Sequence, residues 1–243
     1  MFLKNFIYYH VVTIKNSTSN IKKGMSFSVI ITAGGIGKRM GSAIPKQFIE
    51  VSGLPILMHT ILCFHRFDSR TQIIITLPND WKSYWEELLI THSFIVPHIV
   101  VDGGIERYDS IKNALSVCEF DLIAVHDGVR PLVSNETIQK CLDLAIEQGS
   151  AIPTLPIKES IRKTDGFTTK SLERKEYLTV QTPQIFTAEM LKNAYKIPFH
   201  GGITDDASLV EEAGFSVGIT IGNEENIKIT TQFDLKIVSL LLK

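Results

Sequence analysis

A glycine-rich loop followed by cations is the segment whose chemistry is easiest to infer. Residues 33–41 read AGGIGKRMG, so that Lys38 and Arg39 follow the glycines directly, and Lys46 comes a few positions later. Glycines let backbone N–H groups approach an anion closely, and the cations add fixed positive charge. We interpret this segment as a phosphate-binding loop. Taken alone, it is equally compatible with an ordinary glycine-rich turn that carries surface cations.

Two standard phosphate-binding motifs do not fit this loop. A Walker A motif requires GxxxxGK[ST], but Lys38 is followed by Arg39 and the glycine spacing is different. A dinucleotide fingerprint requires GxGxxG, whereas Gly35, Gly37 and Gly41 give GxGxxxG. The loop therefore belongs to neither motif.

A second candidate is an acidic residue at the end of an apolar run. Residues 121–126 read DLIAVH, and Asp127 follows them, with Arg130 three positions later. Mg²⁺ in proteins is held by one or two carboxylates together with phosphate oxygens and water. Asp127 is thus a candidate metal ligand, which Arg130 would orient; a buried Asp–Arg pair with a structural role is the alternative. We expect His126 to be a packed, hydrogen-bonded structural residue.

The elements that position these groups alternate between strand and helix. The sequence predicts strands over 27–32, 72–77, 97–101, 121–126, 151–157 and 217–221. It predicts helices from residue 55 onward and over 79–91, 106–118, 134–148 and 204–214, and at the C-terminus. Uninterrupted apolar strands of this kind indicate a mostly parallel α/β sheet covered by helices on both faces. Ligands bind beyond the carboxyl ends of such strands, which is where both candidate segments lie.

Two segments depart from this alternation. Residues 1–25 are interpreted as an N-terminal extension, with an added edge strand as the alternative, and residues 26–243 as a single domain. Residues 158–180 are polar and contain Asp165-Gly166, a hairpin signal. We expect a protruding β-arm there, which would pack on a second subunit and make the protein a homodimer.

Composition narrows the classes of function. The chain has 243 residues, 44% of them hydrophobic, and carries 25 Lys and Arg against 26 Asp and Glu. This near-neutral balance argues against a nucleic-acid binder. Three widely spaced cysteines fit neither a disulfide framework nor a zinc site, so a reducing cytoplasm is expected. There is no apolar run long enough to cross a bilayer.

Six motifs in order give the chain a family resemblance. AGGIGKRMGSAIPKQF resembles the opening signature of nucleotidyltransferases that make activated sugars and polyols, and its PKQF ending is the form of the polyol-phosphate cytidylyltransferases. The five further motifs are GGIERYDS at 103–110, VHDGVRP at 125–131, PIKES at 156–160, RKEYLTVQTPQ at 174–184 and NIKIT at 226–230. The resemblance runs from Phe27 to about Leu242 and implies a Rossmann-like nucleotidyltransferase fold.

The resemblance also implies roles for individual residues. Catalytic positive charge would come from Arg39, Lys46 and Lys228. The nucleotide would be bound by Ala33, Gly34, Gly35, Gly37, Gly104, Ser110 and Gly128. The acceptor phosphate would be held by Ser160, Arg174, Thr182 and Lys228. Ser160 stands where many members have Thr, so that the hydroxyl is kept and the methyl lost. Asp127 would bind Mg²⁺ or another divalent cation, oriented by Arg130.

The reaction implied is transfer of a cytidylyl group from CTP to a polyol phosphate, with release of pyrophosphate. A phosphate monoester is already an anionic nucleophile at pH 7, so positioned positive charge matters more than a general base. The TDDA segment at 204–207, the block from Glu106 to Ser110 and the length of the arm favour 2-C-methyl-D-erythritol 4-phosphate as the acceptor. Ribitol 5-phosphate is the alternative acceptor, favoured by Gly34-Gly35 and by Val129.

Two other classes of function stay open at this point. One is a nicotinamide-dependent oxidoreductase, against which the glycine spacing argues. The other is a non-catalytic nucleotide-binding module, against which the three candidate catalytic cations argue.

Overall fold

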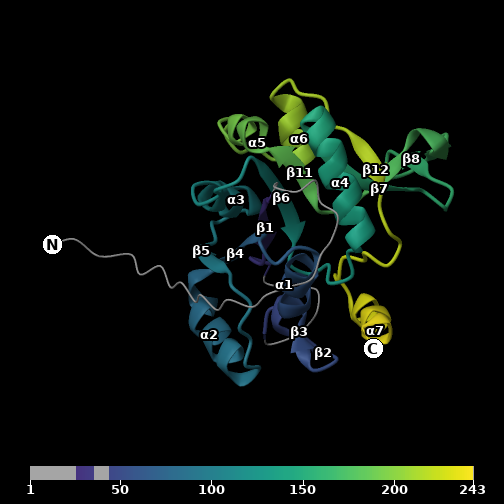
Figure 1. Cartoon of the computed structure of the whole chain (residues 1–243). Helices are drawn as coiled ribbons and strands as arrows, with labels where there is room; N and C mark the ends of the chain where they lie inside the picture. The colour runs from purple at the N-terminus through teal and green to yellow at the C-terminus, as the bar shows by residue number, and fades with distance from the viewer. Residues whose placement is uncertain (1–25, 36–43, 243) are drawn as a thin grey trace.

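The fold is built on one mixed sheet (Figure 1). The computed structural model describes residues 26–35 and 44–242. The sheet has the order β10-β7-β11-β6-β1-β4-β5, and β12 pairs with β7. Its strands are β1 (Ser28–Thr32), β4 (Gln72–Leu77), β5 (Ile99–Asp102), β6 (Leu122–Asp127), β7 (Ser150–Pro156), β10 (Leu178–Val180), β11 (Gln184–Thr187) and β12 (Ile219–Ile221).

The central strands run parallel and end at a common edge. β1 lies between β4 and β6 and is parallel to both, so that Thr32 is level with Thr76 on one side and Asp127 on the other. The predicted mostly parallel α/β sheet is confirmed. Its carboxyl edge collects the ends of β1, β4 and β6, as expected for a ligand-binding edge.

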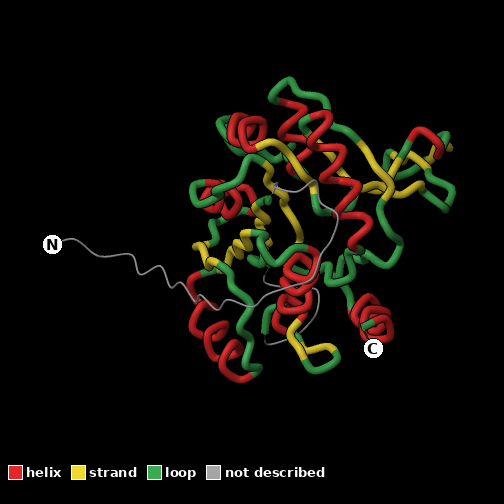
Figure 2. Tube along the Cα trace, viewed as in Figure 1, coloured by secondary structure: helices red, strands yellow, loops and turns green. Residues whose placement is uncertain are grey.

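Helices cover both faces of the sheet (Figures 1 and 2). One face packs against α1 (Ile56–Phe67), α2 (Lys82–Thr91) and α4 (Asn135–Gln148). The other packs against α3 (Arg107–Leu115), α5 (Ala188–Ala194) and α6 (Asp206–Glu212). Because successive strand side chains point to opposite faces, Val29 and Ile31 join the first cluster and Ile30 the second.

A small third cluster lies beside the carboxyl edge. The C-terminal helix α7 (Gln232–Leu241) lies next to β2 (Glu50–Val51), which pairs with β3 (Leu54–Pro55). Val238 of α7 and Ile229 are both fully buried in this cluster. The segment that carries Lys228 is therefore anchored by its apolar neighbour.

Capping residues in the sequence predicted the ends of several helices correctly. The Ser134 side chain accepts a hydrogen bond from the Thr137 backbone N–H, and the helix that it caps ends at Gly149, whose φ is 87°. That left-handed conformation favours glycine. Asp205 caps α6 in the same way, accepting from Ser208. Residues 79–81 form a 3₁₀ turn before α2 begins, so this helix starts later than expected.

The central part of the sheet contains elements that the sequence did not reveal. β11 is antiparallel to both of its neighbours, β6 and β7, and α5 follows it directly. These elements are only four and seven residues long, too short for a clear periodic pattern.

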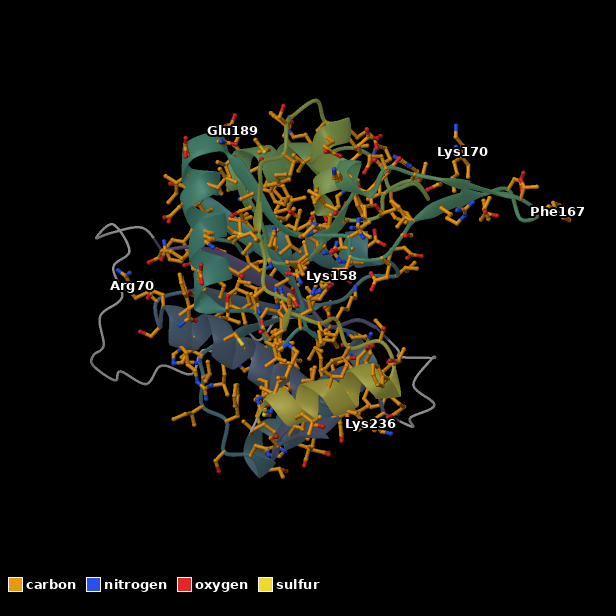
Figure 3. The ribbon with its side chains drawn as sticks, turned by 90° about the vertical axis from the view of Figure 1, so that its right-hand side faces the viewer. Arg70, Lys158, Phe167, Lys170, Glu189 and Lys236 are labelled. Atoms are coloured by element: carbon orange, nitrogen blue, oxygen red, sulfur yellow. The ribbon has the colours of Figure 1, made fainter. Side chains whose placement is uncertain are left out.

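The expected arm projects from the body of the molecule (Figure 3). It is the hairpin of β8 (Arg162–Thr164) and β9 (Thr169–Ser171), and Phe167 at its tip is 99% exposed. The last residues of the predicted arm, 178–180, form β10 in the main sheet. The extension expected at 1–25 lies outside the described residues. Within 26–35 and 44–242, no helix is long and apolar enough to span a membrane.

Candidate active site

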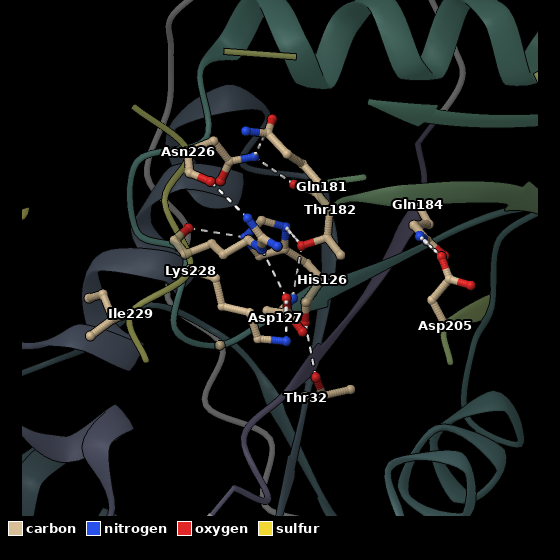
Figure 4. Close-up of polar contacts among 12 residues, drawn as sticks. Thr32, His126, Asp127, Gln181, Thr182, Gln184, Asp205, Asn226, Lys228 and Ile229 are labelled. Atoms are coloured by element: carbon tan, nitrogen blue, oxygen red, sulfur yellow. Dashed lines mark hydrogen bonds and ion pairs between the residues drawn. The ribbon is translucent and has the colours of Figure 1, made fainter. Parts of the chain in front are cut away.

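The site is centred on Asp127 at the end of β6 (Figure 4). One carboxylate oxygen, Oδ2, lies 2.9 Å from Nε of Arg130 and 3.2 Å from Nζ of Lys228. The Asp127 side chain is 9% exposed, whereas that of Lys228 is 45% exposed. Lys228 thus reaches from open solvent to a nearly buried carboxylate.

Positive charge dominates the surroundings of this carboxylate. Burial by itself would raise the pKa of Asp127, but Lys228, Arg107 and Arg130 outweigh burial and hold that pKa well below its usual value. The carboxylate is therefore ionised at neutral pH. Since Arg107 also pairs with Asp206, three cations face two carboxylates here, which leaves a net positive charge at this edge of the sheet.

The two lysines expected to act together meet at one short segment of the chain. Nζ of Lys46 donates a hydrogen bond of 2.8 Å to the carbonyl of Ile229, 183 positions along the chain. Ile229 follows Lys228 directly, so both lysines converge on one short segment. That both amines reach a common triphosphate stays a prediction.

Behind Asp127, a buried histidine holds the TPQ segment in place. Nε2 of His126 lies 3.1 Å from the carbonyl of Arg130 and Nδ1 lies 3.0 Å from Oγ1 of Thr182. A carbonyl only accepts, so Nε2 carries the proton and the Thr182 hydroxyl donates to Nδ1. Burial lowers the pKa of His126 to about 4, which keeps the ring neutral. His126 is therefore the packed, hydrogen-bonded residue that was expected.

Thr182 is already engaged on both sides. Its hydroxyl also accepts a 3.1 Å hydrogen bond from the backbone N–H of Asp127, and the residue is only 6% exposed. The expected phosphate ligand is thus next to Asp127, with its hydroxyl bonded to protein.

Asn226 is a positioning residue that the motif reading did not single out. Its side-chain amide donates a hydrogen bond of 2.8 Å to the backbone carbonyl of Thr182. Its backbone carbonyl accepts a hydrogen bond of 2.8 Å from the Arg130 guanidinium. Fully buried, it joins the Lys228 segment to Thr182 and Arg130, which both bond to Asp127. Its place in the NIKIT motif, two positions before Lys228, is the signal that could have identified it.

The described part of the glycine-rich loop starts directly at the end of β1. Gln47, which is 1% exposed, donates a 2.6 Å hydrogen bond to the carbonyl of Ala33. A Cβ placed on Gly35 would lie 3.9 Å from Cε of Lys46, so the lysine stem runs beside the loop. Gln47 is a second residue missed from the sequence; it belongs to the PKQF motif. Gly37 and Arg39 lie outside the described residues.

Two tightly packed glycines, Gly104 and Gly128, lie at the expected nucleotide site. A Cβ on Gly104 would lie 2.1 Å from Cβ of Asp109, and one on Gly128 would lie 2.9 Å from the carbonyl oxygen of Thr32. Neither position has room for a side chain. Ser110 accepts a 3.0 Å hydrogen bond from the Gly104 N–H, and Gly34 lies beside its hydroxyl. The glycine-rich loop and the segment 103–110, which are both expected to bind the nucleotide, are therefore adjacent.

The arm residues lie apart from this cluster within the single chain. Arg174 is exposed and donates a 2.5 Å hydrogen bond to the carbonyl of Lys158, and Ser160 is exposed as well. Among the described residues, neither forms a hydrogen bond or ion pair with the Asp127 cluster. Lys158 itself pairs with Glu224 at 2.6 Å, which ties the base of the arm to the segment before Lys228.

The residues present fit a metal ion only in combination with a substrate. In the part of the chain that the structure describes, no three His, Cys, Asp or Glu side chains are grouped so as to hold a metal. Mg²⁺ commonly takes one or two carboxylates and completes its coordination with phosphate oxygens and water. The ionised Asp127 suits that pattern. Both of its ion pairs use Oδ2, so Oδ1 is the oxygen that would face a metal ion.

Comparison with known proteins gives one consistent result. The profile of the family described as IspD, 2-C-methyl-D-erythritol 4-phosphate cytidylyltransferase, matches residues 27–243. A protein of that name from Bacteroides thetaiotaomicron is 48% identical over 219 residues, which cover 90% of this chain and all of the relative. Another from Porphyromonas gingivalis is 47% identical, covering 88% of this chain and 96% of the relative.

Solved structures agree with the sequence comparison. The crystal structure of 4-diphosphocytidyl-2C-methyl-D-erythritol synthase from Anaerococcus prevotii is similar at a TM-score of 0.76 and 27% identity, covering 90% of this chain and 96% of that one. The 2-C-methyl-D-erythritol 4-phosphate cytidylyltransferase of Thermus thermophilus has a TM-score of 0.74 at 27% identity, covering 89% and 98%. These relatives are all named for methylerythritol, and none of them is named as a ribitol-phosphate enzyme or an oxidoreductase.

Proposed function

The chain belongs to the 2-C-methyl-D-erythritol 4-phosphate cytidylyltransferase family, and from this membership we propose how its residues carry out the reaction. The enzyme transfers a cytidylyl group from CTP to 2-C-methyl-D-erythritol 4-phosphate. The products are 4-diphosphocytidyl-2-C-methyl-D-erythritol and pyrophosphate, and the step belongs to the non-mevalonate route to isoprenoid precursors.

The chemical step is an in-line displacement at phosphorus. An oxygen of the acceptor phosphate forms a bond to the α-phosphorus of CTP, while the bond from that phosphorus to the bridging oxygen of the β-phosphate breaks. The electron pair leaves with pyrophosphate. No proton has to be removed from the nucleophile, so the barrier is mainly the approach of two anions and the charge that develops around the α-phosphate.

Lys46 and Lys228 supply fixed positive charge to that step. The observation that carries this proposal is their convergence, with Lys46 bonded to the Ile229 carbonyl and Lys228 to Asp127. Held in this way, the amines need little reorganisation as charge develops, which is the condition for strong electrostatic catalysis. Arg39 is the third cation in this proposal, on the strength of its motif.

The nucleotide lies along the ends of β1 and β5. Backbone groups of the glycine-rich loop bind its phosphates, while the segment 103–110 binds the base and ribose. The adjacency of Gly34 and Ser110 supports a single continuous nucleotide surface. The residues proposed for it are Ala33, Gly34, Gly35, Gly37, Gly104, Ser110 and Gly128.

The acceptor phosphate is gripped partly by a second subunit. Lys228 comes from the body of one protomer, as does Thr182, whose hydroxyl would exchange its bond to His126 for one to the phosphate. Ser160 and Arg174 come from the arm of its partner. Two features support a homodimer: the arm projects from its own chain with an exposed Phe167, and Arg174 is exposed and separate from its own chain's Asp127. The planar guanidinium of Arg174 suits a phosphate monoester.

Asp127 would hold Mg²⁺ together with the phosphates of CTP, with Arg130 fixing the carboxylate. When bound, the ion neutralises phosphate charge in reactions of this class.

We place the enzyme in the cytoplasm, since its three cysteines are free thiols.

One assay panel tests the assignment. The purified full chain is given each of the four ribonucleoside triphosphates with either polyol phosphate and Mg²⁺, and pyrophosphate release is followed. Release is expected with CTP and the methylerythritol phosphate. Faster release with ribitol 5-phosphate, or none with any pair, would refute the proposed function.

The same assay tests the arm. Arg174→Ala and Lys46→Ala are each expected to have low activity, and mixing the two proteins should restore part of it, because one of the two sites in a mixed dimer receives both native residues. If the mixed sample is no more active than the sum of its parts, the arm does not act across subunits.

A further inference from the structure

Asp206 belongs to the TDDA segment at the start of α6. Asp205 does cap α6. Asp206 behaves differently, because its side chain is fully buried and both of its oxygens are bonded. Oδ2 accepts a 2.6 Å hydrogen bond from Arg107, and Oδ1 accepts a 2.7 Å hydrogen bond from the Tyr195 hydroxyl.

The partner of Asp206 opens the helix that carries the nucleotide segment. Arg107 is the first residue of α3 and lies 99 positions before Asp206. Its neighbour Tyr108 stacks on Tyr195, with ring centroids 4.9 Å apart, and donates to the carbonyl of Ile197 at 2.6 Å. Two successive residues of α3 are thus fixed to α5 and α6.

The first turn of α3 in turn fixes the loop in front of it. The Gly104 N–H donates to Ser110, whose hydroxyl donates to the carbonyl of Glu106 at 3.1 Å. Asp109 caps the helix by accepting from the Glu106 N–H at 3.0 Å. Because Gly104 is also packed against Asp109, the loop cannot move without α3. Its position therefore depends on whatever holds the start of that helix.

Arg107 also remains partly exposed and acts electrostatically on Asp127. Its side chain is 33% exposed, and its charge is one of those that lower the pKa of Asp127. At the other end, the Ala207 N–H donates to Gln184 at 2.9 Å, two positions after Thr182. The ion pair therefore lies between the nucleotide loop and the TPQ segment.

We propose that Arg107 is a positioning residue for CTP: paired with the buried Asp206, it fixes the start of α3 and so the Gly104–Ser110 surface on which the nucleotide binds. This rests on the proposed function and adds a residue to the nucleotide subsite without placing it in contact with the reacting atoms. A planar, permanently charged guanidinium suits a buried carboxylate better than an ammonium does.

The test compares Arg107→Met, Asp206→Asn and the double variant with the wild-type enzyme. Each single variant is expected to raise KM and Kd for CTP on the order of tenfold to a hundredfold, as small displacements of a binding surface do. In the same two variants, KM for the polyol phosphate should change by less than about twofold. The double variant should be no worse than the worse single one, since neither charge is then left unpaired. Arg107→Lys should recover part of the affinity, and it replaces Arg107→Met if that variant fails to fold.

A matched control separates positioning from general loosening. Asp68→Asn breaks another Arg–Asp contact, that with Arg70 at 2.8 Å, on the amino side of β4. It is expected to lower Tm while leaving both KM values unchanged. The proposal is overturned if Asp206→Asn behaves like this control, or if KM rises equally for both substrates. Calorimetric Kd values for CTP need no acceptor, so they remain decisive even if the wild-type enzyme does not turn over the methylerythritol phosphate, an outcome that would refute the proposed function alone.

Discussion

Replacing Lys46 by methionine tests the fixed-charge mechanism most directly. Methionine keeps an unbranched stem to run beside Gly35 and removes the ammonium group that bonds to Ile229. The change therefore removes a charge with little loss of packing. Losing one hydrogen bond costs roughly 1 kcal/mol of stability, against about 5–15 kcal/mol for a typical domain, so the variant should fold.

The expected loss of activity follows from the charge that the substitution removes. A unit charge about 4 Å from a phosphate oxygen, at an effective dielectric constant of about 20, contributes on the order of 4 kcal/mol. That figure sets an upper limit near 10³ in rate, since about 1.4 kcal/mol corresponds to tenfold. Removal of a single preorganised donor typically costs 10²–10³ in kcat. We expect kcat for Lys46→Met to fall by about 10²–10³.

The assay is pyrophosphate release at saturating CTP and 2-C-methyl-D-erythritol 4-phosphate, with Tm measured alongside. Lys236→Met on α7 is the matched control, because that lysine is exposed and is not one of the ion-pair partners of Asp127; its kcat should equal that of the wild type. A kcat for Lys46→Met within threefold of wild type, in folded protein, would remove Lys46 from the mechanism.

Three further outcomes are expected. Gly104→Ala should raise KM for CTP and lower stability by about 1–3 kcal/mol, because its Cβ would overlap Asp109, whereas Gly201→Ala, with nothing within 4 Å of its Cβ, should change neither in the same kinetic and urea-unfolding measurements. Arg174→Ala should raise KM for the polyol phosphate far more than KM for CTP; an equal rise in both would argue against an acceptor role. Stability should fall between pH 7.5 and 5.5, partly through His98. Burial lowers the pKa of this histidine, and its Nε2 accepts a 3.1 Å hydrogen bond from Trp85. The unfolded chain therefore takes up a proton in this range more readily than the folded one, which favours unfolding. In His98→Gln the urea midpoint should vary less over this pH range, and an unchanged slope would refute the assignment.

Local patterns in the sequence were sufficient for most of the elements. Apolar runs identified the central strands, while Ser134 and Gly149 marked the ends of α4, because capping and backbone preferences act over a few residues. The strands at 72–77 and 122–127 lie within one residue of the prediction. The glycine-rich loop and the Asp127 segment were assigned to the carboxyl edge correctly, since parallel strands must end there together.

The contacts that make a site were decided only by the tertiary structure. That Lys46 bonds to Ile229, that Lys228 reaches Asp127 and that Arg107 pairs with Asp206 depends on the order of the strands, which places segments 99 to 183 positions apart side by side. β11 shows the same limit, for its insertion between β6 and β7 comes from long-range hydrogen bonds that four residues cannot signal. Residue types and spacing set the chemistry available to the chain, and packing across the sheet set which of those groups meet.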